Sequence, residues 1–296
     1  MDHVLTLIDA DGGLDDAATT RIRSTLTDLG ADTLSARWLA EGRAVDLPFT
    51  LLAPDQAEAA ARRLLAGRPV DVIAQPAEHR RKMLLLADMD STMVVGETLD
   101  ELADFAGLKA EISAITARAM NGEIDFAGAF RERVGRLAGL SAACLEETFQ
   151  RLDMMPGGPT LVATMKTAGA YTVLVSGGFR FFTGRVRERC GFDRDIGNDI
   201  EIADARLTGR VIEPIIDRGG KLQNLTAIAG ERRLPLSLSL AVGDGANDLE
   251  MIDAAGLGVA FHAKPVVAAQ ARARVDYNDL TALLFAQGYR EDEFVG

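Results

Sequence analysis

Cysteine is nearly absent from this chain of 296 residues, which contains only Cys144 and Cys190. The two lie far apart and lack the spacing of metal-binding cysteines, which argues against a disulfide-rich scaffold and a cysteine-based zinc site. We expect both to be reduced, buried thiols of a cytoplasmic protein. Histidine is also rare, with three residues, and we interpret His79 and His262 as ordinary surface or core residues rather than as catalysts.

Long apolar runs and an excess of basic residues are missing as well. No run approaches the roughly 18 apolar residues of a membrane span, and residues 1–5 lack the positive charge and apolar stretch of a signal peptide. The 32 basic and 44 acidic side chains give a net charge of −12, which disfavours nucleic acid or an anionic membrane surface as a partner. We expect a soluble protein of about two domains, whose 48% hydrophobic content is ample for a large core.

The most informative feature is an apolar run that ends in two aspartates, in residues 84–92, LLLADMDST. Its apolar residues predict a buried parallel strand, and Asp88 and Asp90 follow at the carboxyl end, where ligands bind in open α/β sheets. Two carboxylates so close are costly unless a cation or a shared proton holds them. A hard divalent ion such as Mg²⁺ suits this pair, with one carboxylate free to attack phosphorus. Taken alone, the motif is also compatible with a solvated surface turn.

A second acidic cluster follows residues 236–242, which also predict a strand. The sequence continues as GDGAND, in which the glycines allow a tight turn. Asp244 and Asp248 offer oxygen ligands, and Asn247 adds a hydrogen-bonding group without charge. The ligand rhythm of an EF-hand calcium loop is missing. Two strand-end carboxylate clusters in one chain therefore indicate a shared metal site.

Two further segments supply groups suited to a phosphate. Residues 171–179 predict a third apolar strand that ends in a hydroxyl and glycines. The Ser176 hydroxyl and the following backbone N–H groups, beginning with Gly177, can donate to anionic oxygens. A plain strand-to-helix turn is an equal alternative for this segment alone. Lys221 opens a helix-like stretch. A lone lysine is usually solvated, but in a phosphate site it would balance the carboxylates and the charge of the leaving group.

In this order the four motifs resemble those of the haloacid dehalogenase-like (HAD) phosphatase superfamily and, within it, the phosphoserine phosphatase family. The resemblance runs from about residue 80 to about residue 285. It implies an α/β fold, with a Rossmann-like core and parallel sheet over residues 78–96 and 155–296 and an α-helical cap over about 97–154. A lid of this kind excludes water once the substrate is bound.

The resemblance implies Mg²⁺-dependent hydrolysis of O-phospho-L-serine to L-serine and phosphate, the last step of serine biosynthesis. Asp88 would be the nucleophile that forms an aspartyl phosphate, and Asp90 would be general acid and then general base. The implied metal ligands are Asp88, Asp90 through its backbone carbonyl, Asp244 and Asp248. The implied substrate-binding residues are Glu97 for the ammonium group, Arg133 for the carboxylate, Met120 and Phe126 from the cap, Ser176, Gly177 and Lys221 for the phosphoryl group, and Asn247.

The same chemistry follows from the residues without the family. A phosphomonoester resists attack because the nucleophile and the ester are both anionic, and a metal between them offsets that repulsion. Phosphoserine is a zwitterionic amino acid with a phosphate, so it calls for one anion near its ammonium group and one guanidinium on its carboxylate. Glu97 and Arg133 could provide them. Exposed helix charges paired with their neighbours are the alternative for these two residues.

Other functions stay open beside this one. Thr98 and Leu99 depart from the residues usual in the family at the substrate end, which favours a phosphatase or phosphotransferase for another small phosphomonoester, such as phosphohomoserine, as the nearest rival. A non-catalytic amino-acid-sensing protein is a second rival, although all the residues of the proposed core chemistry are present. A cation-pump ATPase shares part of the motif logic, but it needs membrane spans.

Residues 1–77 predict a separate α+β unit. The expected elements are a strand at 3–8, a helix at 14–29, a hairpin of 33–39 with 45–52, a helix at 54–65 and a strand at 69–74. This β-α-β-β-α-β order is ferredoxin-like, and it is similar to the ACT-like domains that precede many bacterial phosphoserine phosphatases. Such domains commonly bind amino acids or form homodimers, and the sequence leaves both roles open. Residues 75–82 are polar, contain proline and predict a linker.

Overall fold

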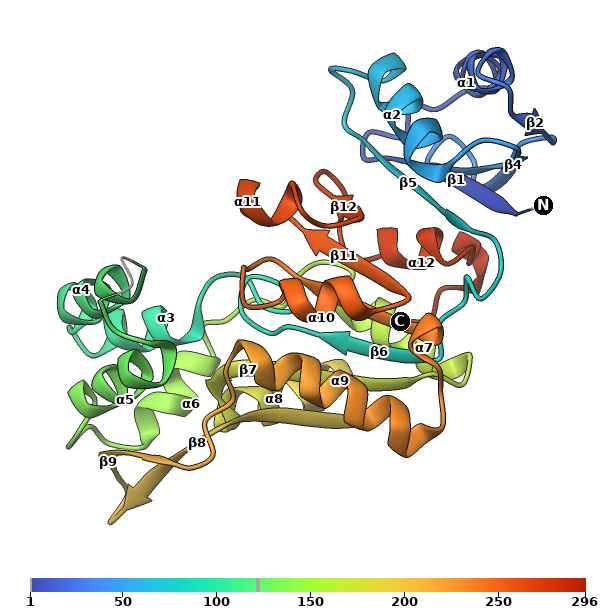
Figure 1. The fold of residues 1–296 in the computed structure, drawn as a ribbon. Coiled ribbons are helices and arrows are strands. Elements are labelled where there is room, and N and C mark those ends of the chain that lie inside the picture. The colour runs from blue at the N-terminus through green and yellow to red at the C-terminus, as the bar shows by residue number, and fades with distance from the viewer. Residues whose placement is uncertain (1, 121–122) are drawn as a thin grey trace.

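The computed structural model describes residues 2–120 and 123–296, which form an amino-terminal unit and a larger unit, each built on its own sheet (Figure 1). The amino-terminal unit consists of β1 (His3–Asp9), α1 (Asp16–Asp28), β2 (Asp32–Thr33), β3 (Arg37–Ala40), β4 (Ala44–Thr50), α2 (Pro54–Leu64) and β5 (Val70–Pro76). Its antiparallel sheet has the order β2-β4-β1-β5, with β3 also paired to β4. The structure thus has the order β-α-β-β-β-α-β, because the strand expected at 33–39 is divided into β2 and β3, both paired with β4.

Strand β1 is buried on both faces, and this explains how the two units meet. Leu5 and Leu7 pack in a cluster with residues of α1 and α2, whereas Ile8 belongs to the hydrophobic cluster of the larger unit. Ala44 of β4 and Ile73 of β5 join Ile8 in that cluster. One sheet face thus carries the unit's own helices, and the other packs against the rest of the chain.

The larger unit contains a seven-stranded sheet in the order β12-β11-β10-β6-β7-β8-β9. The strands are β6 (Leu84–Ala87), β7 (Tyr171–Phe179), β8 (Arg194–Ala203), β9 (Arg206–Ile212), β10 (Ser239–Gly243), β11 (Leu257–Phe261) and β12 (Ala273–Val275). All neighbours pair in parallel except β8 and β9. Because β6 is the first of these strands in sequence and lies between β10 and β7, the carboxyl ends of these three strands form the crevice where an open α/β sheet binds ligands.

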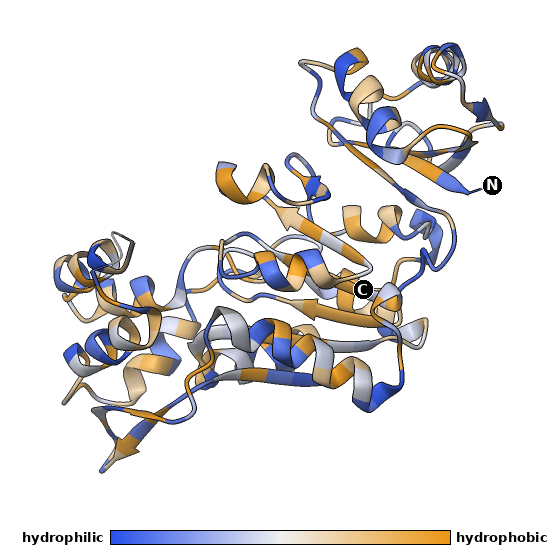
Figure 2. Ribbon diagram, in the orientation of Figure 1, coloured by the Kyte–Doolittle hydropathy of each residue, from blue (hydrophilic) through white to orange (hydrophobic). Residues whose placement is uncertain are grey.

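Apolar side chains place this sheet inside the molecule. Leu84 and Leu86 of β6 face one hydrophobic cluster and Leu85 and Ala87 face another, so β6 is covered on both sides. The central strands are accordingly among the most hydrophobic segments in Figure 2. The flanking helices are α7 (Gly158–Thr167), α8 (Arg180–Cys190), α9 (Arg218–Arg232), α10 (Leu249–Ala254), α11 (Pro265–Ala268) and α12 (Ala282–Ala286), with short 3₁₀ turns η1 (Leu236–Leu238) and η2 (Glu291–Glu293).

Four helices between β6 and α7 lie together at one end of the sheet, beyond the carboxyl end of β6 (Figure 1). They are α3 (Thr98–Phe105), α4 (Lys109–Met120), α5 (Phe126–Arg136) and α6 (Ala143–Phe149). The turn after α5 is tied to the sheet, because the backbone N of Gly139 donates to the carbonyl O of Leu207 at 2.8 Å and the N of Leu207 donates to the O of Leu140 at 2.9 Å. The expected helical insertion is thus present.

Two expectations need correction in detail, those for residues 236–238 and 75–82. Residues 236–238 form η1 rather than strand, and β10 begins only at Ser239, whose hydroxyl donates to the carbonyl O of Leu236 at 2.7 Å. By contrast, strand β7 spans Tyr171–Phe179 as expected, so Ser176 and Gly177 lie within the strand and not in a strand-to-helix turn. The segment 75–82 is not a solvated linker, because its polar side chains are used in contacts between the two units.

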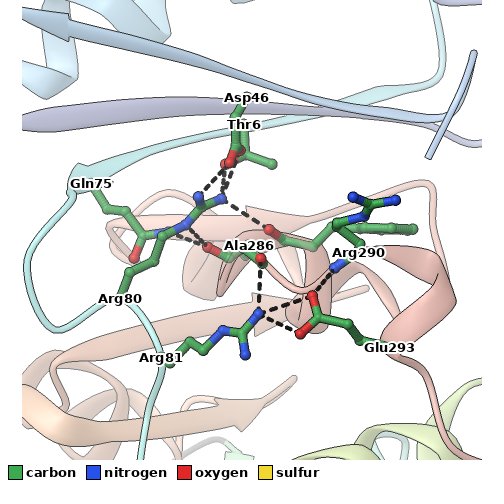
Figure 3. A network of polar contacts seen from close by, with 10 residues as sticks. Thr6, Asp46, Gln75, Arg80, Arg81, Ala286, Arg290 and Glu293 are labelled. Carbon is green, nitrogen blue, oxygen red and sulfur yellow. Dashed lines mark hydrogen bonds and ion pairs between the residues drawn. The ribbon is translucent and has the colours of Figure 1, made fainter. Parts of the chain in front are cut away.

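Arg80 is the centre of those contacts (Figure 3). Its guanidinium donates to both carboxylate oxygens of Asp46 on β4, and Nη2 also donates to the hydroxyl of Thr6 at 2.8 Å. On the other side, its Nε donates to the carbonyl O of Ala286 at 2.7 Å, which also accepts from Gln75 Nε2 at 2.6 Å. The connecting segment therefore joins β1 and β4 to α12.

No helix in the described part of the chain combines the length and the apolar character needed to cross a membrane. Cys144 and Cys190 are free and buried, as expected.

Candidate active site

A cavity of about 400 Å³ opens where the ends of β6, β7 and β10 meet the helices α3 to α5. Its wall contains most of the residues singled out from the sequence: Asp88, Asp90, Glu97, Phe126, Arg133, Ser176, Gly177, Asp244 and Asn247. These residues are spread over the sequence from Asp88 to Asn247. The parallel sheet brings them together because the carboxyl ends of its strands lie along one edge. Met120 ends α4, and its side chain lies outside the described residues, so its expected contact stays a prediction.

A buried lysine lies between two carboxylates at the floor of the site. Lys221 Nζ is 2.6 Å from Asp88 Oδ1 and 2.5 Å from Asp248 Oδ1, and all three side chains are buried. Burial alone would lower the pKa of Lys221, but the two carboxylates outweigh it and hold that pKa above its ordinary value, so the ammonium stays charged. The second oxygen of Asp248 accepts a hydrogen bond from the backbone N of Gly245 at 3.1 Å. This hydrogen bond orients the Asp248 carboxylate toward Lys221.

Three carboxylates in the floor have the chemistry of a magnesium site. Asp88, Asp244 and Asp248 offer oxygen atoms that all lie within 4.8 Å of one another. Burial, and then the charge of Asp248, raises the pKa of Asp88, and burial also raises the pKa of Asp244. One ammonium group, that of Lys221, does not balance three carboxylates. A hard divalent cation bound by oxygen ligands would complete the balance, so these residues fit Mg²⁺.

Asp90 is held apart from that cluster by the start of α3. Its Oδ1 accepts from the backbone N of Thr98 at 2.7 Å, and its Oδ2 accepts from the hydroxyl of Ser176 at 3.3 Å. Burial raises the pKa of Asp90, although these hydrogen bonds act in the opposite direction. A carboxyl group with a raised pKa, aimed into the cavity beside Asp88, is suited to give and take a proton.

The cavity wall also carries one further acidic and one basic side chain, those of Glu97 and Arg133. Glu97 is the N-cap residue of α3, and its Oε1 accepts a hydrogen bond from Ser91 Oγ at 2.9 Å. Desolvation, and then the charge of Asp90, raises the pKa of Glu97 to about 7, and its exposure to solvent screens part of this effect. Arg133 of α5 is half-buried, and burial lowers its pKa despite the attraction of Asp100 and Glu97. Within the described residues Arg133 forms no ion pair, so its guanidinium is available to an anionic ligand.

An aromatic wall connects the cap helices to the sheet. Phe126 of α5 is 38% exposed and stacks on Phe130, with ring centroids 6.2 Å apart. Phe130 in turn packs edge-on against Phe179 at the end of β7. A Cβ atom at Gly177 would lie 3.0 Å from Phe126 Cζ, so the ring approaches the strand this closely only because residue 177 is glycine.

Two features of the site were missed in the sequence. Lys264 lines the cavity, with Nζ 3.8 Å from Asp244 Oδ2. In the sequence, Lys264 follows an apolar strand and directly precedes Pro265 at the first turn of a helix. This pattern is too common to indicate a site residue. The second feature is the backbone N of Thr98, which donates to Asp90 and leaves no trace in the sequence because every non-proline residue offers such a group.

Comparison with known proteins agrees with this geometry. The model of the haloacid dehalogenase-like hydrolase family matches residues 85–253. This chain belongs to that family. The match includes Asp88, Ser176, Lys221 and Asp248 and ends before Lys264. The resemblance drawn from the sequence and the α/β fold with a parallel sheet are therefore confirmed.

Individual members of the family extend the likeness. A phosphoserine phosphatase of Streptomyces coelicolor (strain ATCC BAA-471 / A3(2) / M145) is 41% identical over 227 residues, which are 77% of this chain and 55% of that protein. A HAD family hydrolase from Salmonella enterica subsp. enterica serovar Typhi has a TM-score of 0.84 at 31% identity, and the match covers 98% of this chain and 99% of that one. A substrate-bound phosphoserine phosphatase complex has a TM-score of 0.64 at 35% identity and covers 69% of this chain and 97% of that one. The chain spans 55%, 52% and 63% of the first three curated relatives that it matches.

Proposed function

We propose that this protein is a Mg²⁺-dependent phosphatase that hydrolyses O-phospho-L-serine to L-serine and phosphate, the last step of serine biosynthesis. The observation that carries the proposal is one cavity whose wall contains Glu97, Arg133 and Asp88, the last paired with the buried Lys221. The relatives named phosphoserine phosphatase support the same reading.

Asp88 is proposed as the nucleophile. Its buried carboxylate lies at the strand end, and Lys221 holds one of its oxygens at 2.6 Å, so the other remains for attack on phosphorus. Ser176, which is buried at the end of β7, would donate its hydroxyl to the phosphoryl oxygens, and Gly177 leaves room for them beside it. Attack forms a bond between Asp88 and phosphorus and breaks the bond from phosphorus to the seryl oxygen.

Asp90 is proposed to move the protons of both steps. Its raised pKa lets it protonate the departing seryl oxygen, and the resulting carboxylate can then take a proton from the water that attacks the aspartyl phosphate. The hydrogen bond from the backbone N of Thr98 holds the carboxyl group in place during both transfers, while the Ser176 hydroxyl turns from Asp90 to the phosphoryl group. Mg²⁺ held by Asp88, Asp244 and Asp248, with the backbone carbonyl of Asp90, would lower the repulsion between the anionic nucleophile and the anionic ester.

The substrate's amino acid moiety is proposed to lie between α3 and α5. Glu97 would attract its ammonium group, and the guanidinium of Arg133 would bind its carboxylate with two parallel hydrogen bonds. Phe126 and Met120 would cover it from the cap, and Asn247 would order the floor from the turn after β10.

The direct test is phosphate release from O-phospho-L-serine with and without Mg²⁺, beside phosphoethanolamine, phosphohomoserine and glycerol phosphate. Phosphoethanolamine lacks the carboxylate, and glycerol phosphate lacks both charged groups. We expect metal-dependent turnover with the highest kcat/KM for phosphoserine. Equal kcat/KM for all four esters would contradict the serine assignment, and a preference for phosphohomoserine would favour the nearest rival.

Arg133→Met should lower kcat/KM for phosphoserine by about 10- to 100-fold, because a charge-assisted hydrogen bond contributes on the order of 1.5–3 kcal/mol. The variant should hydrolyse phosphoethanolamine at nearly the same rate as the wild type does, because this ester has no carboxylate for Arg133 to bind. Arg131→Met is the matched control, since Arg131 lies on the same helix but pairs with Glu213 on the surface. An equal loss for both esters would show that Arg133 supports the cap and does not recognise the carboxylate.

Glu97 should make phosphoserine binding depend on pH. Its pKa of about 7 in the free protein means that the side chain is ionised above this value and neutral below it, so the attraction for an ammonium group weakens as the pH falls. We expect kcat/KM for phosphoserine to fall below pH 7 through a limb that is absent in Glu97→Gln. Glycerol phosphate is the control ester, and the same limb with that substrate would contradict this role.

We also propose residues 1–77 as an ACT-like domain and residues 78–296 as the catalytic domain. The separate hydrophobic cluster of the first unit and its ferredoxin-like strand order support the division. Titration of the full chain with L-serine and measurement of its mass in solution would test amino-acid binding and a homodimer.

A further inference from the structure

A buried carboxylate of the amino-terminal unit holds a turn of the core. Asp71 of β5 is fully buried, and its Oδ1 accepts a hydrogen bond from the backbone N of Asp276 at 2.7 Å. Its Oδ2 accepts from the backbone N and from Nδ2 of Asn278, at 3.0 and 2.9 Å, and from the N of Tyr277 at 3.3 Å. These N–H groups face the carboxylate together, so removing its charge would weaken the contacts that hold the turn 276–278.

The same turn holds His262, the residue that follows β11. His262 Nε2 lies 2.9 Å from the carbonyl oxygen of Asn278, which can only accept, so the ring donates this hydrogen bond. The backbone N of His262 donates to the carbonyl O of Val275 at 2.9 Å, and its ring stacks on Phe261. His262 has φ of 43°, a left-handed conformation that is uncommon for residues other than glycine and that these contacts stabilise.

Lys264 follows two residues later and lies at the active site. Its backbone N donates to the carbonyl O of Asp244 at 3.3 Å, and Nζ is 3.8 Å from Asp244 Oδ2. Four carboxylates line the cavity: Asp88, Asp90, Glu97 and Asp244. Among the described residues of its wall, Lys264 and Arg133 are the two basic side chains. Lys264 therefore adds positive charge to the cavity wall beside Asp244.

We propose that Asp71 is a positioning residue for the active site. By holding residues 276–278 it holds His262, and through His262 the loop that keeps Lys264 at the cavity wall, where its charge attracts an anionic substrate. The amino-terminal unit thereby contributes to substrate binding although none of its described residues lines the cavity. The substrate part of this inference rests on the proposed function, and the structural part does not.

Hydrogen exchange in the full chain without substrate tests the structural part. The amides of His262, Lys264, Val267 and Ala268 are all hydrogen-bonded in this loop. In Asp71→Asn we expect residues 262–268 to exchange about tenfold faster than in the wild type, because local opening becomes easier when a tertiary contact is lost. Arg43→Gln is the matched control: it removes another contact between the units, with Glu291 and Thr281, and should leave residues 262–268 unchanged. Unchanged exchange in Asp71→Asn would overturn the proposal.

Steady-state kinetics with phosphoserine test the substrate part. Lys264→Met should raise KM about three- to fivefold with little change in kcat, which is the size expected for a charge as exposed as this one. Asp71→Asn should raise KM to a similar extent, and the double variant should show no further increase, because the two residues act through one contact. KM effects that multiply would mean that Asp71 acts independently of Lys264 and would contradict the proposal.

A second variant covers the case in which Asp71→Asn does not fold. His262→Phe keeps the stacking on Phe261 and removes only the hydrogen bond to Asn278, and it should raise KM as Lys264→Met does. An unchanged KM in His262→Phe would contradict the proposal. If the wild type releases no phosphate from phosphoserine, the proposed function fails and the exchange measurement, which uses no substrate, decides the role of Asp71 by itself.

Discussion

Asp88→Asn is expected to lower kcat for phosphate release on the order of 10⁴-fold or more, because the amide cannot attack phosphorus. The structure gives no substitute nucleophile in the same place. The two oxygens of Asp90 accept hydrogen bonds from the backbone N of Thr98 and the hydroxyl of Ser176, and Asp248 has one oxygen on Lys221 and the other on the backbone N of Gly245. Measurement of phosphate release from phosphoserine under saturating Mg²⁺ tests this expectation.

Stability separates this loss from unfolding. Burial and the nearby Asp248 raise the pKa of Asp88, which means that its charge is unfavourable in the metal-free fold. Asp88→Asn should therefore unfold at the same or a higher urea concentration than the wild type when no metal is present. Asp104→Asn, on the exposed surface of α3 where Asp104 pairs with Lys109, is the control and should keep full activity. Activity within tenfold of the wild type in Asp88→Asn would rule out Asp88 as the nucleophile.

Lys221→Met is expected to lower both the free energy of unfolding and the rate. The ammonium group holds two buried carboxylates, and removal of one partner from a buried ion pair costs about 3–5 kcal/mol, since it leaves uncompensated charge. We expect kcat to fall about 10²- to 10³-fold, because a donor to the developing charge of the phosphoryl group is lost. Urea unfolding and phosphate release measure the two effects.

Magnesium should restore part of the stability lost in Lys221→Met, because a cation bound to Asp88, Asp244 and Asp248 would supply some of the missing positive charge. Lys166→Met is the matched control: Lys166 pairs with Asp193 at 2.9 Å on the surface, so its loss should cost less than about 1 kcal/mol and should not respond to metal. A similar loss of unfolding free energy in both variants would show that the buried ion pairs of Lys221 with Asp88 and Asp248 contribute no more to stability than a surface ion pair.

The sequence predicts the floor of the site well for a physical reason. Apolar runs that end in polar residues mark the carboxyl ends of buried strands, and parallel strands bring those ends to one edge. Asp88, Ser176 and Asp244 were expected there on this basis, and the structure brings all three to one cavity. Lys221 was a weaker candidate, because a single lysine at the start of a helix is usually solvated, and the family resemblance supported its place in the site.

The contacts between the two units could not be predicted from the sequence. Asp71 and Asn278 are separated by 207 residues, and their pairing depends on how the two sheets meet. His262 was interpreted as an ordinary residue, yet its ring bonds to the turn that Asp71 holds. Arg80 was assigned to a polar linker, but it forms an ion pair with Asp46 between the two units. Patterns of hydrophobicity locate elements, and they do not say which polar side chains meet after the elements pack.

The covalent role of Asp88 can be measured most directly in Asp90→Asn with 4-nitrophenyl phosphate. This ester needs no acid because its leaving group departs as an anion, whereas the second step still needs Asp90 to take a proton from water. The account predicts a rapid release of one nitrophenolate per active site, slow turnover afterwards, and a phosphoryl group on the peptide that contains Asp88 after acid quenching. A phosphoryl group on another residue, or steady turnover with no phosphorylated protein, would contradict the account.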